Sequence, residues 1–258
     1  MTATQHPPRH GHATMNLGSR RAKAEKIENL LKLCLLGRPL RLLEIGCGSG
    51  GIAHYFATHP DLHCQVTGVD VTDTRQIFDG YAFVHVQGAQ LPFDDGAFDV
   101  VLSNHVIEHV GTTADQLLHL KEIRRVLAAS GSAYLAVPNR WMLTEPHYRL
   151  KLLSWWPRSW RSTYLRWMGK GSFYDCEPLQ MQELERLLTQ AGLHYSNQSV
   201  QGWRATFDIE YPGRWSTRLL QATPDAVLRP LRPIIPTLIY RLQRTAPVQA
   251  NASSANQA

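Results

Sequence analysis

The sequence lacks the features that mark membrane-spanning, secreted or disulfide-stabilised proteins. No apolar run reaches the roughly 18 residues that a transmembrane helix needs, and the first residues, MTATQHPPRHGHATMNLGSRR, contain no apolar core of a signal peptide. The cysteines are scattered without a C-x-x-C pair, which favours neither a disulfide framework nor a metal site: Cys34, Cys47, Cys64 and Cys176. We therefore expect a cytoplasmic, reducing setting and no bound metal.

The chain also lacks excess charge, except in one segment. Its net charge is +6, yet the residues from Arg140 to Lys170 hold seven basic residues and one acidic residue, so the remainder is balanced. The same segment holds five of the seven tryptophans: Trp141, Trp155, Trp156, Trp160 and Trp167. A protein that binds nucleic acid through a broad basic surface is not indicated, and this basic, aromatic segment needs its own explanation.

The length of 258 residues and the absence of internal repeats predict one large domain with insertions. By composition, residues 1–18 and 245–258 are expected to be disordered ends. Between them, residues 19–244 form the predicted domain, interrupted by two irregular segments at 139–177 and 202–235 that are expected to cap the site or contact substrate.

Apolar runs alternate with helical patterns along this domain. Strands are expected at 40–46, 64–70, 81–86, 97–104, 131–138, 193–200 and 236–244, and helices at 20–36, from Gly50, at 112–129, at 157–168 and at 177–192. In the first helix, Ile27, Leu30, Leu31, Cys34 and Leu35 would share one face. Near-continuous apolar strands separated by helices predict a doubly wound, Rossmann-like α/β fold with a mostly parallel, seven-stranded sheet covered on both faces.

A glycine-rich turn, LLEIGCGSGG, directly follows the first strand. Gly46, Gly48 and Gly51 fit the G-x-G-x-x-G pattern of dinucleotide-binding proteins, with Asp70 at a suitable distance. The same stretch reads E-x-G-x-G-x-G, and Glu44, two residues before the first glycine, would repel a pyrophosphate but suit a ligand with a positive amino group. The turn therefore leaves a nicotinamide-dependent oxidoreductase open but favours S-adenosylmethionine.

The next block, LPFDDGAFDVVLSNHVIEHV, resembles the class I S-adenosylmethionine-dependent methyltransferases, in particular the group that includes the ubiquinone-biosynthesis methyltransferases. With the glycine turn and Asp70, the resemblance spans about residues 40–138 and the later helix and strands. It implies a last strand antiparallel to the others, S-adenosylmethionine as cofactor, and a cofactor site made by Glu44, Gly46, Gly48, Gly50, Asp70, Val71, Gln87, Gly88 and Asn104. Gln87 stands where the family usually has an acidic residue.

Three residues in NHVIEHV are candidates for catalysis. His105, Glu108 and His109 are three and four residues apart, so on a helical turn they would share a face and could provide a general base or even hold a metal ion. A structural role for Glu108 remains an equal alternative. Asn139, His147 and Tyr148 follow the fifth strand and are the candidates for substrate contact, because ligands bind at the carboxyl edge of such sheets.

The basic, aromatic segment admits three interpretations. In the predicted helix 157–168, Trp160, Tyr164 and Trp167 share one face and Arg158 and Arg166 lie opposite. This pattern suits a cap packed on the core, an interfacial helix on an anionic membrane, or, with least support, a nucleic-acid contact.

The predicted function is methyl transfer from S-adenosylmethionine to oxygen, nitrogen or carbon of a small, amphipathic or lipid-linked acceptor. A non-catalytic cofactor-binding module and an RNA methyltransferase stay open as alternatives, as does peripheral contact with the inner face of a membrane. The sequence does not indicate the oligomeric state.

Overall fold

The computed structural model describes residues 17–145 and 147–245. Most of the two predicted disordered ends, 1–18 and 245–258, therefore lies outside the described residues. The first helix, α1 (Leu17–Leu31), already includes the last two residues of the first of these segments. Within the described ranges, no helix is both long and apolar enough to cross a membrane.

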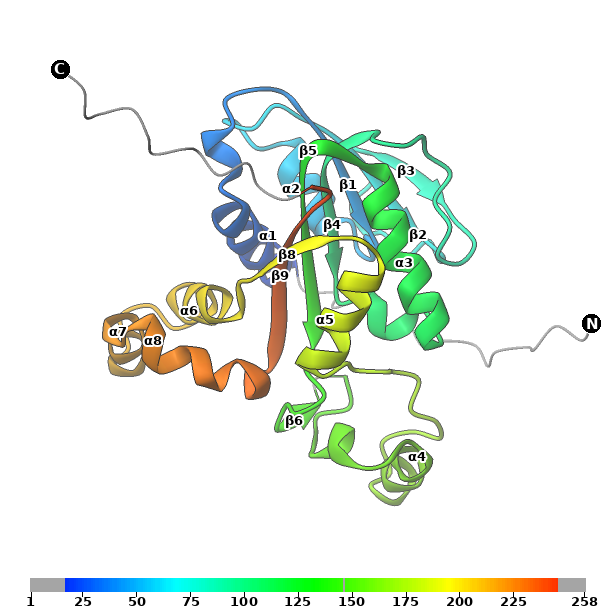
Figure 1. The fold of residues 1–258 in the computed structure, drawn as a ribbon, viewed down its shortest axis with the longest axis vertical. Helices are drawn as coiled ribbons and strands as arrows, with labels where there is room; N and C mark the ends of the chain where they lie inside the picture. Colours follow the sequence, from blue (N-terminus) through cyan, green and yellow to red (C-terminus); the bar gives the residue numbers. More distant parts are fainter. Residues whose placement is uncertain (1–16, 146, 246–258) are drawn as a thin grey trace, which may run out of the picture.

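One seven-stranded sheet forms the centre of the molecule, in the order β3-β2-β1-β4-β5-β9-β8 (Figure 1). Its strands are β1 (Leu40–Ile45), β2 (Cys64–Asp70), β3 (Ala82–His85), β4 (Phe98–Asn104), β5 (Leu127–Pro138), β8 (His194–Asn197) and β9 (Thr237–Gln243). The first five strands pair in parallel, and β9 runs antiparallel to both β5 and β8. The predicted fold class and the predicted antiparallel last strand are confirmed.

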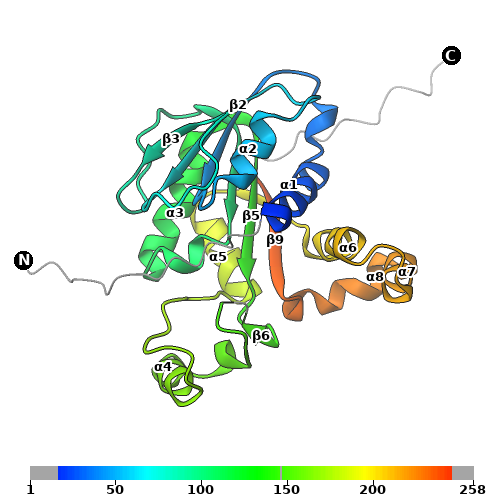
Figure 2. The ribbon, with the colours of Figure 1, turned by 180° about the vertical axis from the view of Figure 1, so that it is seen from behind.

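Helices cover both faces of this sheet, which explains why its central strands are apolar along their length. On one face, α1 and α2 (Gly51–Ala57) pack Ala24, Ile27 and Phe56 against the sheet. On the other, α3 (Thr113–Val126) and α5 (Met181–Gln190) contribute Leu120 and Leu188 to the larger core cluster. The two views of Figures 1 and 2 show these layers from opposite sides. Burial on both faces is the expected environment for parallel strands.

The predicted first helix, 20–36, extends too far at its C-terminal end. Helix α1 stops at Leu31, Lys32 is left-handed (φ 56), and a single 3-10 turn, η1 (Leu33–Leu35), follows. Leu33 takes the buried position, whereas Cys34 is exposed and donates to Glu28 Oε1 at 2.8 Å. A left-handed residue breaks the helical repeat, so the predicted apolar face does not continue through Cys34.

The segment after β5 extends beyond the carboxyl end of the sheet, at the bottom of Figures 1 and 2. It contains the short hairpin β6 (Thr144–Glu145) and β7 (Leu150–Lys151), the turn η3 (Leu153–Trp155) and helix α4 (Arg158–Trp167). A small core of its own holds it together, made by Leu150, Leu153, Leu165, Tyr174 and Cys176. The predicted helix in this segment is confirmed.

The expected irregular segment at 202–235 is instead mostly helical. It contains α6 (Ser199–Glu210), α7 (Trp215–Ala222), α8 (Asp225–Leu228) and the 3-10 helix η4 (Arg229–Ile234). The expected strand at 193–200 ends at Asn197 because α6 begins two residues later. Val200, Leu220, Leu228 and Ile235 form a shared core that stabilises these short helices despite their proline and arginine content.

Candidate active site

A cavity of about 860 Å³ opens at the carboxyl edge of the sheet. Its wall combines the ends of β1, β2, β4 and β5 with residues from α1, from the loop after β6 and from the start of β9. The sequence-predicted residues that line it are Gly46, Gly48, Asp70, Val71, Gly88, Asn104, His105, His109 and His147. The fold therefore brings most of the cofactor candidates and three of the imidazoles into one space.

The glycine turn is built so that only glycine fits at Gly46. Its φ is +71°, and an added Cβ would lie 2.6 Å from a methyl group of Val106. The backbone N–H of Gly46 and that of Cys47 both donate to the carbonyl of Val69. The backbone can thus approach a ligand closely at this point, which is what a cofactor-binding turn requires.

Asp70 ends β2 and meets this turn directly. Its Oδ2 accepts a hydrogen bond from the backbone N–H of Gly48 at 2.9 Å, and its Oδ1 lies 3.3 Å from the N–H of Thr72. The neighbouring Val71 side chain is exposed within the cavity wall. A carboxylate beside an apolar side chain suits a ribose diol next to an adenine ring.

Three of the cofactor candidates do not line the cavity: Glu44, Gly50 and Gln87. Gly50 has φ +79° and is the N-cap of α2, where the adjacent backbone and Tyr81 leave no room for a Cβ. Gln87 is exposed to solvent. Gly50 therefore shapes the backbone of the turn and does not itself face the cavity.

Glu44 is buried beneath the turn, and its Oε2 has no hydrogen-bond partner among the described residues. Burial raises the pKa of this carboxyl to about 8, while Arg20 nearby acts in the opposite direction. A buried acceptor without a partner favours a positively charged ligand group close by. Together with the glycine cradle and Asp70, this observation fits S-adenosylmethionine, which carries an ammonium and a sulfonium and no phosphate.

The three catalytic candidates form a connected group. His105 lies just beyond β4 with a left-handed backbone (φ 60), and its Nδ1 is 3.4 Å from Oε1 of Glu108. Glu108 and His109 belong to the 3-10 turn η2 (Ile107–His109), and Glu108 is fully buried behind the two histidines. Non-glycine residues in this backbone region are uncommon and cluster at functional sites.

Of the three substrate candidates, the structure brings only His147 to the cavity. Asn139 is fully buried and donates to the carbonyls of Pro233 and Ile235, both at 2.8 Å, so it connects the two segments beyond the sheet. Tyr148 donates to Oδ1 of Asp175 at 3.0 Å and packs against Tyr174. These two side chains support the wall and do not form part of it.

The cavity also has a basic wall that the sequence analysis missed. Arg20 and Lys23 from α1 and Arg149 from the loop before β7 line it. Burial lowers the pKa of Lys23 to about 8, with Arg20 and Lys26 acting in the same direction. In the sequence, Arg20 and Lys23 look like the solvated face of an amphipathic helix, and only the packing of α1 over the sheet edge turns them inward.

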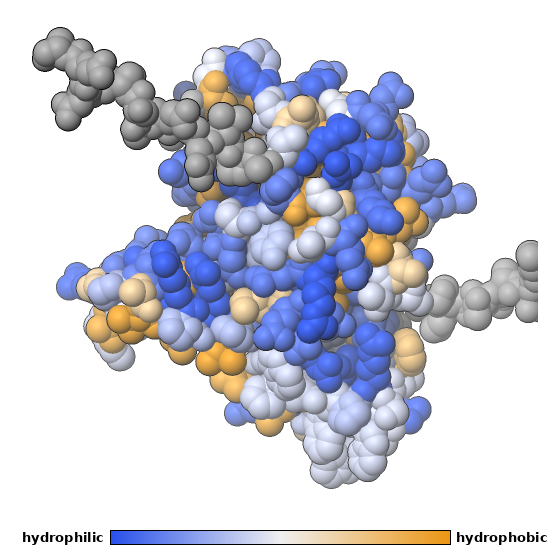
Figure 3. All heavy atoms as spheres, viewed as in Figure 1, coloured by the Kyte–Doolittle hydropathy of each residue, from blue (hydrophilic) through white to orange (hydrophobic). Residues whose placement is uncertain are grey.

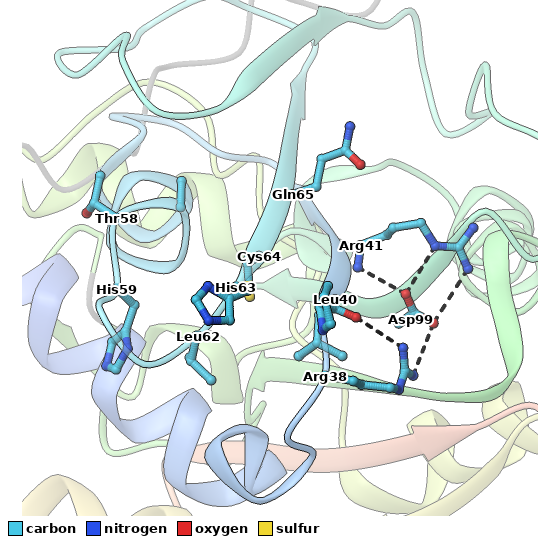
Figure 4. Close-up of a pocket in the computed structure, with 12 residues that line it drawn as sticks. Arg38, Leu40, Arg41, Thr58, His59, Leu62, His63, Cys64, Gln65 and Asp99 are labelled. Atoms are coloured by element: carbon cyan, nitrogen blue, oxygen red, sulfur yellow. Dashed lines mark hydrogen bonds and ion pairs between the residues drawn. The ribbon is translucent and has the colours of Figure 1, made fainter.

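A second cavity, of about 700 Å³, lies at the opposite edge of the sheet and does not belong to this site. It is lined by the amino ends of β1, β2 and β4 (Figure 4). Its charged groups pair with one another, since Asp99 accepts from Arg41 Nε at 3.1 Å and from Arg38 Nη2 at 3.2 Å. Ligands of parallel sheets bind at the carboxyl edge, so this cavity is not the candidate active site.

The sheet order, the antiparallel last strand and the glycine turn at the carboxyl edge define the fold of the class I S-adenosylmethionine-dependent methyltransferases. Residues 43–135 match a family model described as a methyltransferase domain. The resemblance to the group that includes the ubiquinone-biosynthesis methyltransferases is confirmed, and S-adenosylmethionine is the cofactor that the family implies.

Characterised relatives are similar over part of their length. Ajmaline N-methyltransferase of Rauvolfia serpentina is 32% identical over 110 residues, which cover 38% of this chain and 35% of that protein. Ubiquinone biosynthesis O-methyltransferase of Rhizobium etli is 26% identical over 172 residues, covering 62% of each. The chain therefore spans between about a third and three-fifths of the length of these relatives. Among solved structures, the YcgJ protein of Bacillus subtilis shares the fold with a TM-score of 0.50 at 15% identity, over 86% of this chain and 99% of that one.

Proposed function

We propose that the chain transfers a methyl group from S-adenosylmethionine to an oxygen atom of a small acceptor. The observation that carries this proposal is the single cavity in which the glycine turn and Asp70 face a wall of histidines. A methyl donor and an acceptor would then lie in one enclosed space, and holding two reactants in line supplies much of the acceleration of a displacement.

The cofactor would be held at one end of the cavity. Gly46 and Gly48 offer close backbone approach, Asp70 offers acceptor oxygens for the ribose, and Val71 and Gly88 border the place of the adenine. Asn104, at the end of β4 and next to His105 in the chain, also lines the cavity. When bound, the cofactor would supply a methyl group on a positively charged sulfur, so the protein needs only to hold the oxygen of the acceptor in line with it.

We assign to His105 the role of general base, which takes the proton from the oxygen of the acceptor. It lines the cavity next to Asn104, and the carboxylate of Glu108 lies 3.4 Å from its Nδ1. A carboxylate at that distance orients the ring and stabilises its charged form. Burial, with Lys23 and Lys26 acting in the same direction, lowers the pKa of His105 against the opposing effect of Glu108, which favours a neutral imidazole able to accept a proton.

The basic wall favours an acceptor rich in oxygen. Arg20, Lys23 and Arg149 would attract phenolate, carboxylate or phosphate groups and disfavour an amine that must approach as an ammonium. The similarity to ubiquinone biosynthesis O-methyltransferases supports oxygen as the methylated atom. RNA methylation has less support, because the basic residues line a cavity instead of a broad groove.

Peripheral contact with an anionic membrane is the second part of the proposal. The aromatic face of α4 points to solvent, with Trp160 60% exposed and Trp167 81% exposed, while Arg161 and Leu165 are buried. Arg158 and Arg166 on the same helix and Lys170 just after it are exposed as well, and Arg158 pairs with Glu177 at 2.8 Å. Indole rings beside cationic side chains suit the headgroup region of an anionic bilayer.

A second apolar surface lies at the same end of the molecule. It consists of exposed side chains of α7, α8 and η4: Trp215, Leu219, Val227, Leu231 and Ile234. In Figure 3, orange spheres cover these elements at the lower left. The bottom of the molecule, over α4, is pale because tryptophan and tyrosine have intermediate hydropathy on this scale. Both surfaces belong to the segments beyond the carboxyl edge of the sheet, where the cavity opens, which supports a lipid-linked acceptor.

Two measurements test the methyltransferase proposal. Isothermal titration with S-adenosylhomocysteine should give one site per chain, and incubation with radiolabelled S-adenosylmethionine and separate lipid and polar extracts should label an acceptor. Binding without any labelled product across both extracts would favour a non-catalytic module. Absence of binding, or binding of nicotinamide dinucleotide instead, would refute the proposal.

A further inference from the structure

Three side chains far apart in the sequence meet beside the cavity. His109 comes from η2, His147 from the loop between β6 and β7, and Cys176 from the segment before α5. One ligand atom from each lies within 4.8 Å of the others. The Sγ of Cys176 is 3.8 Å from Nδ1 of His109 and 3.8 Å from Nδ1 of His147.

The 3.8 Å between Sγ of Cys176 and Nδ1 of His109 fits one edge of a tetrahedral zinc site. Zinc binds imidazole nitrogen at about 2.0–2.1 Å and thiolate sulfur at about 2.3 Å, which places the two ligand atoms roughly 3.6 Å apart at tetrahedral angles. The two rings are nearly perpendicular, with an interplanar angle of 79°. Thiolate together with imidazole is a donor set that zinc favours over magnesium or calcium.

Carboxylates stand behind each histidine, as they do at zinc sites. Oε1 of Glu145 lies 2.6 Å from Nδ1 of His147, which leaves Nε2 of that ring for the metal, and Oε1 of Glu108 lies 3.9 Å from Nε2 of His109, which leaves Nδ1 of that ring. Such partners orient the ligating rings and raise their basicity. Glu108 is fully buried, and its Oε1 faces the imidazoles of His105 at 3.4 Å and His109 at 3.9 Å, so a nearby cation would further compensate its charge.

The three segments are held together without help from an ion. The backbone N–H of Glu177 donates to the carbonyl of Glu108 at 2.9 Å, and Gln116 Nε2 bridges the carbonyls of Ile107 and Glu177, both at 3.3 Å. The hydroxyl of Tyr148 donates to Oδ1 of Asp175 at 3.0 Å, which joins the His147 loop to the Cys176 segment. The arrangement is therefore preorganised for a ligand.

We propose that His109, His147 and Cys176 bind a zinc ion at the floor of the cavity. Cys176 is buried, whereas both histidines line the cavity, so the fourth coordination position faces the space assigned to the acceptor. Three protein ligands and one open position are typical of zinc sites that bind substrate. A role of the zinc ion in binding the acceptor rests on the proposed methyl transfer, whereas zinc binding itself does not.

Cobalt substitution tests the site without any activity assay. The full-length chain is stripped with a chelator and titrated with Co²⁺, and the thiolate-to-cobalt charge-transfer band is recorded before Zn²⁺ is added. This band is diagnostic because it requires a cysteine, whereas His6, His10 and His12 near the start of the sequence could bind metal without one. We expect one Co²⁺ per chain with a charge-transfer band that Zn²⁺ abolishes.

Matched cysteine variants complete the test. Cys176→Ser should remove the band and weaken zinc binding at least tenfold, whereas Cys64→Ser, a half-buried thiol on β2, should leave both unchanged. His109→Gln is the second variant, in case Cys176→Ser does not fold, and S-adenosylhomocysteine binding reports on the fold of each. A folded wild-type chain that binds the cofactor product but gives no thiolate band would overturn the zinc site and leave the proposed function standing.

Discussion

The carboxylate of Asp70 holds the backbone N–H of Gly48 at 2.9 Å, so the end of β2 and the glycine turn after β1 are joined before any cofactor binds. Asp70 therefore has two tasks in one side chain. It fixes the shape of the turn, and its remaining lone pairs are available for the ribose contact that we propose.

Substitution of Asp70 separates these tasks. Asp70→Asn keeps an oxygen for the Gly48 N–H but loses the charge, and Asp70→Ala loses both. We expect Asp70→Ala to weaken S-adenosylhomocysteine binding roughly ten- to hundredfold, the worth of one or two charge-assisted hydrogen bonds, and Asp70→Asn to weaken it less. Calorimetric titration measures both. Asp61→Ala, at an exposed position, serves as control; equal affinity of Asp70→Ala and wild type would remove Asp70 from the site.

Gly46 and Gly88 allow a test of how tightly the glycine turn is packed, because both have positive φ but only Gly46 has a side chain close to its Cα. A Cβ at Gly46 would lie 2.6 Å from Val106, whereas a Cβ at Gly88 would meet nothing within 4 Å. Gly88→Ala should cost only the backbone strain of about 1 kcal/mol, and Gly46→Ala should cost about 2–4 kcal/mol because overpacking is added. Chemical denaturation gives both values. Equal losses would show that Val106 moves aside freely.

His105→Asn examines catalysis with little disturbance of the backbone, since asparagine tolerates the left-handed conformation that His105 adopts. We expect methyl transfer to fall by roughly 10²–10⁴-fold, the usual worth of a positioned base, with S-adenosylhomocysteine affinity within a few-fold of wild type. Lys32→Asn, also left-handed but at the end of α1, is the matched control. If turnover of His105→Asn stays close to wild type, His105 does not take the proton.

The stability of the protein should depend on pH through His119. This side chain is buried, its Nε2 lies 2.9 Å from Oγ of Ser103, and burial lowers its pKa to about 4. The folded-state pKa is thus below the ordinary 6.5, so between pH 6.5 and about 4 the unfolded chain holds a proton that the native chain does not. Stability should fall over this range as pH decreases, by up to about 3 kcal/mol from this group.

His119→Gln should flatten that part of the profile, as followed by urea denaturation at a series of pH values. His63→Gln, at an exposed histidine, should leave the slope unchanged. A slope that persists in full in His119→Gln would mean that other groups carry the acid sensitivity.

The tryptophans of α4 should determine membrane binding. Trp160→Ala/Trp167→Ala should reduce co-sedimentation with vesicles of phosphatidylglycerol and phosphatidylcholine several-fold, because both indoles are exposed on one side of the helix. The control is Phe78→Ala/Tyr195→Ala, a pair of exposed aromatic residues outside the two apolar surfaces. If wild type binds zwitterionic and anionic vesicles equally weakly, the exposed face serves another partner.

The sequence predicted the sheet well because each central strand is apolar along its length, and β4, with Phe98–Ser103 all buried, is the clearest case. It grouped the glycine turn with Asp70, which the structure brings together at the cavity, because glycine spacing and Asp70 are local features. It failed for α6 to α8, where proline and arginine mask short amphipathic helices whose packing partners are distant in the chain.

The remaining parts of the site depend on contacts that no local spacing reveals. His109 and Cys176 are 67 residues apart and touch only because the segment before α5 returns to η2. In the same way, Asn139 looks like a ligand-binding residue after β5, but its amide is used to join the loop before β9. Lys23 turns inward only through the packing of α1.

The position of β9 has a consequence for synthesis of the chain on the ribosome. Thr237–Gln243 inserts between β5 and β8, so the sheet cannot close until nearly all of the described chain has emerged. Until then β5, whose residues from Gly131 to Pro138 are buried in the finished fold, presents an open and apolar edge. Nascent chains that stall before residue 237 should thus be the species most in need of a chaperone.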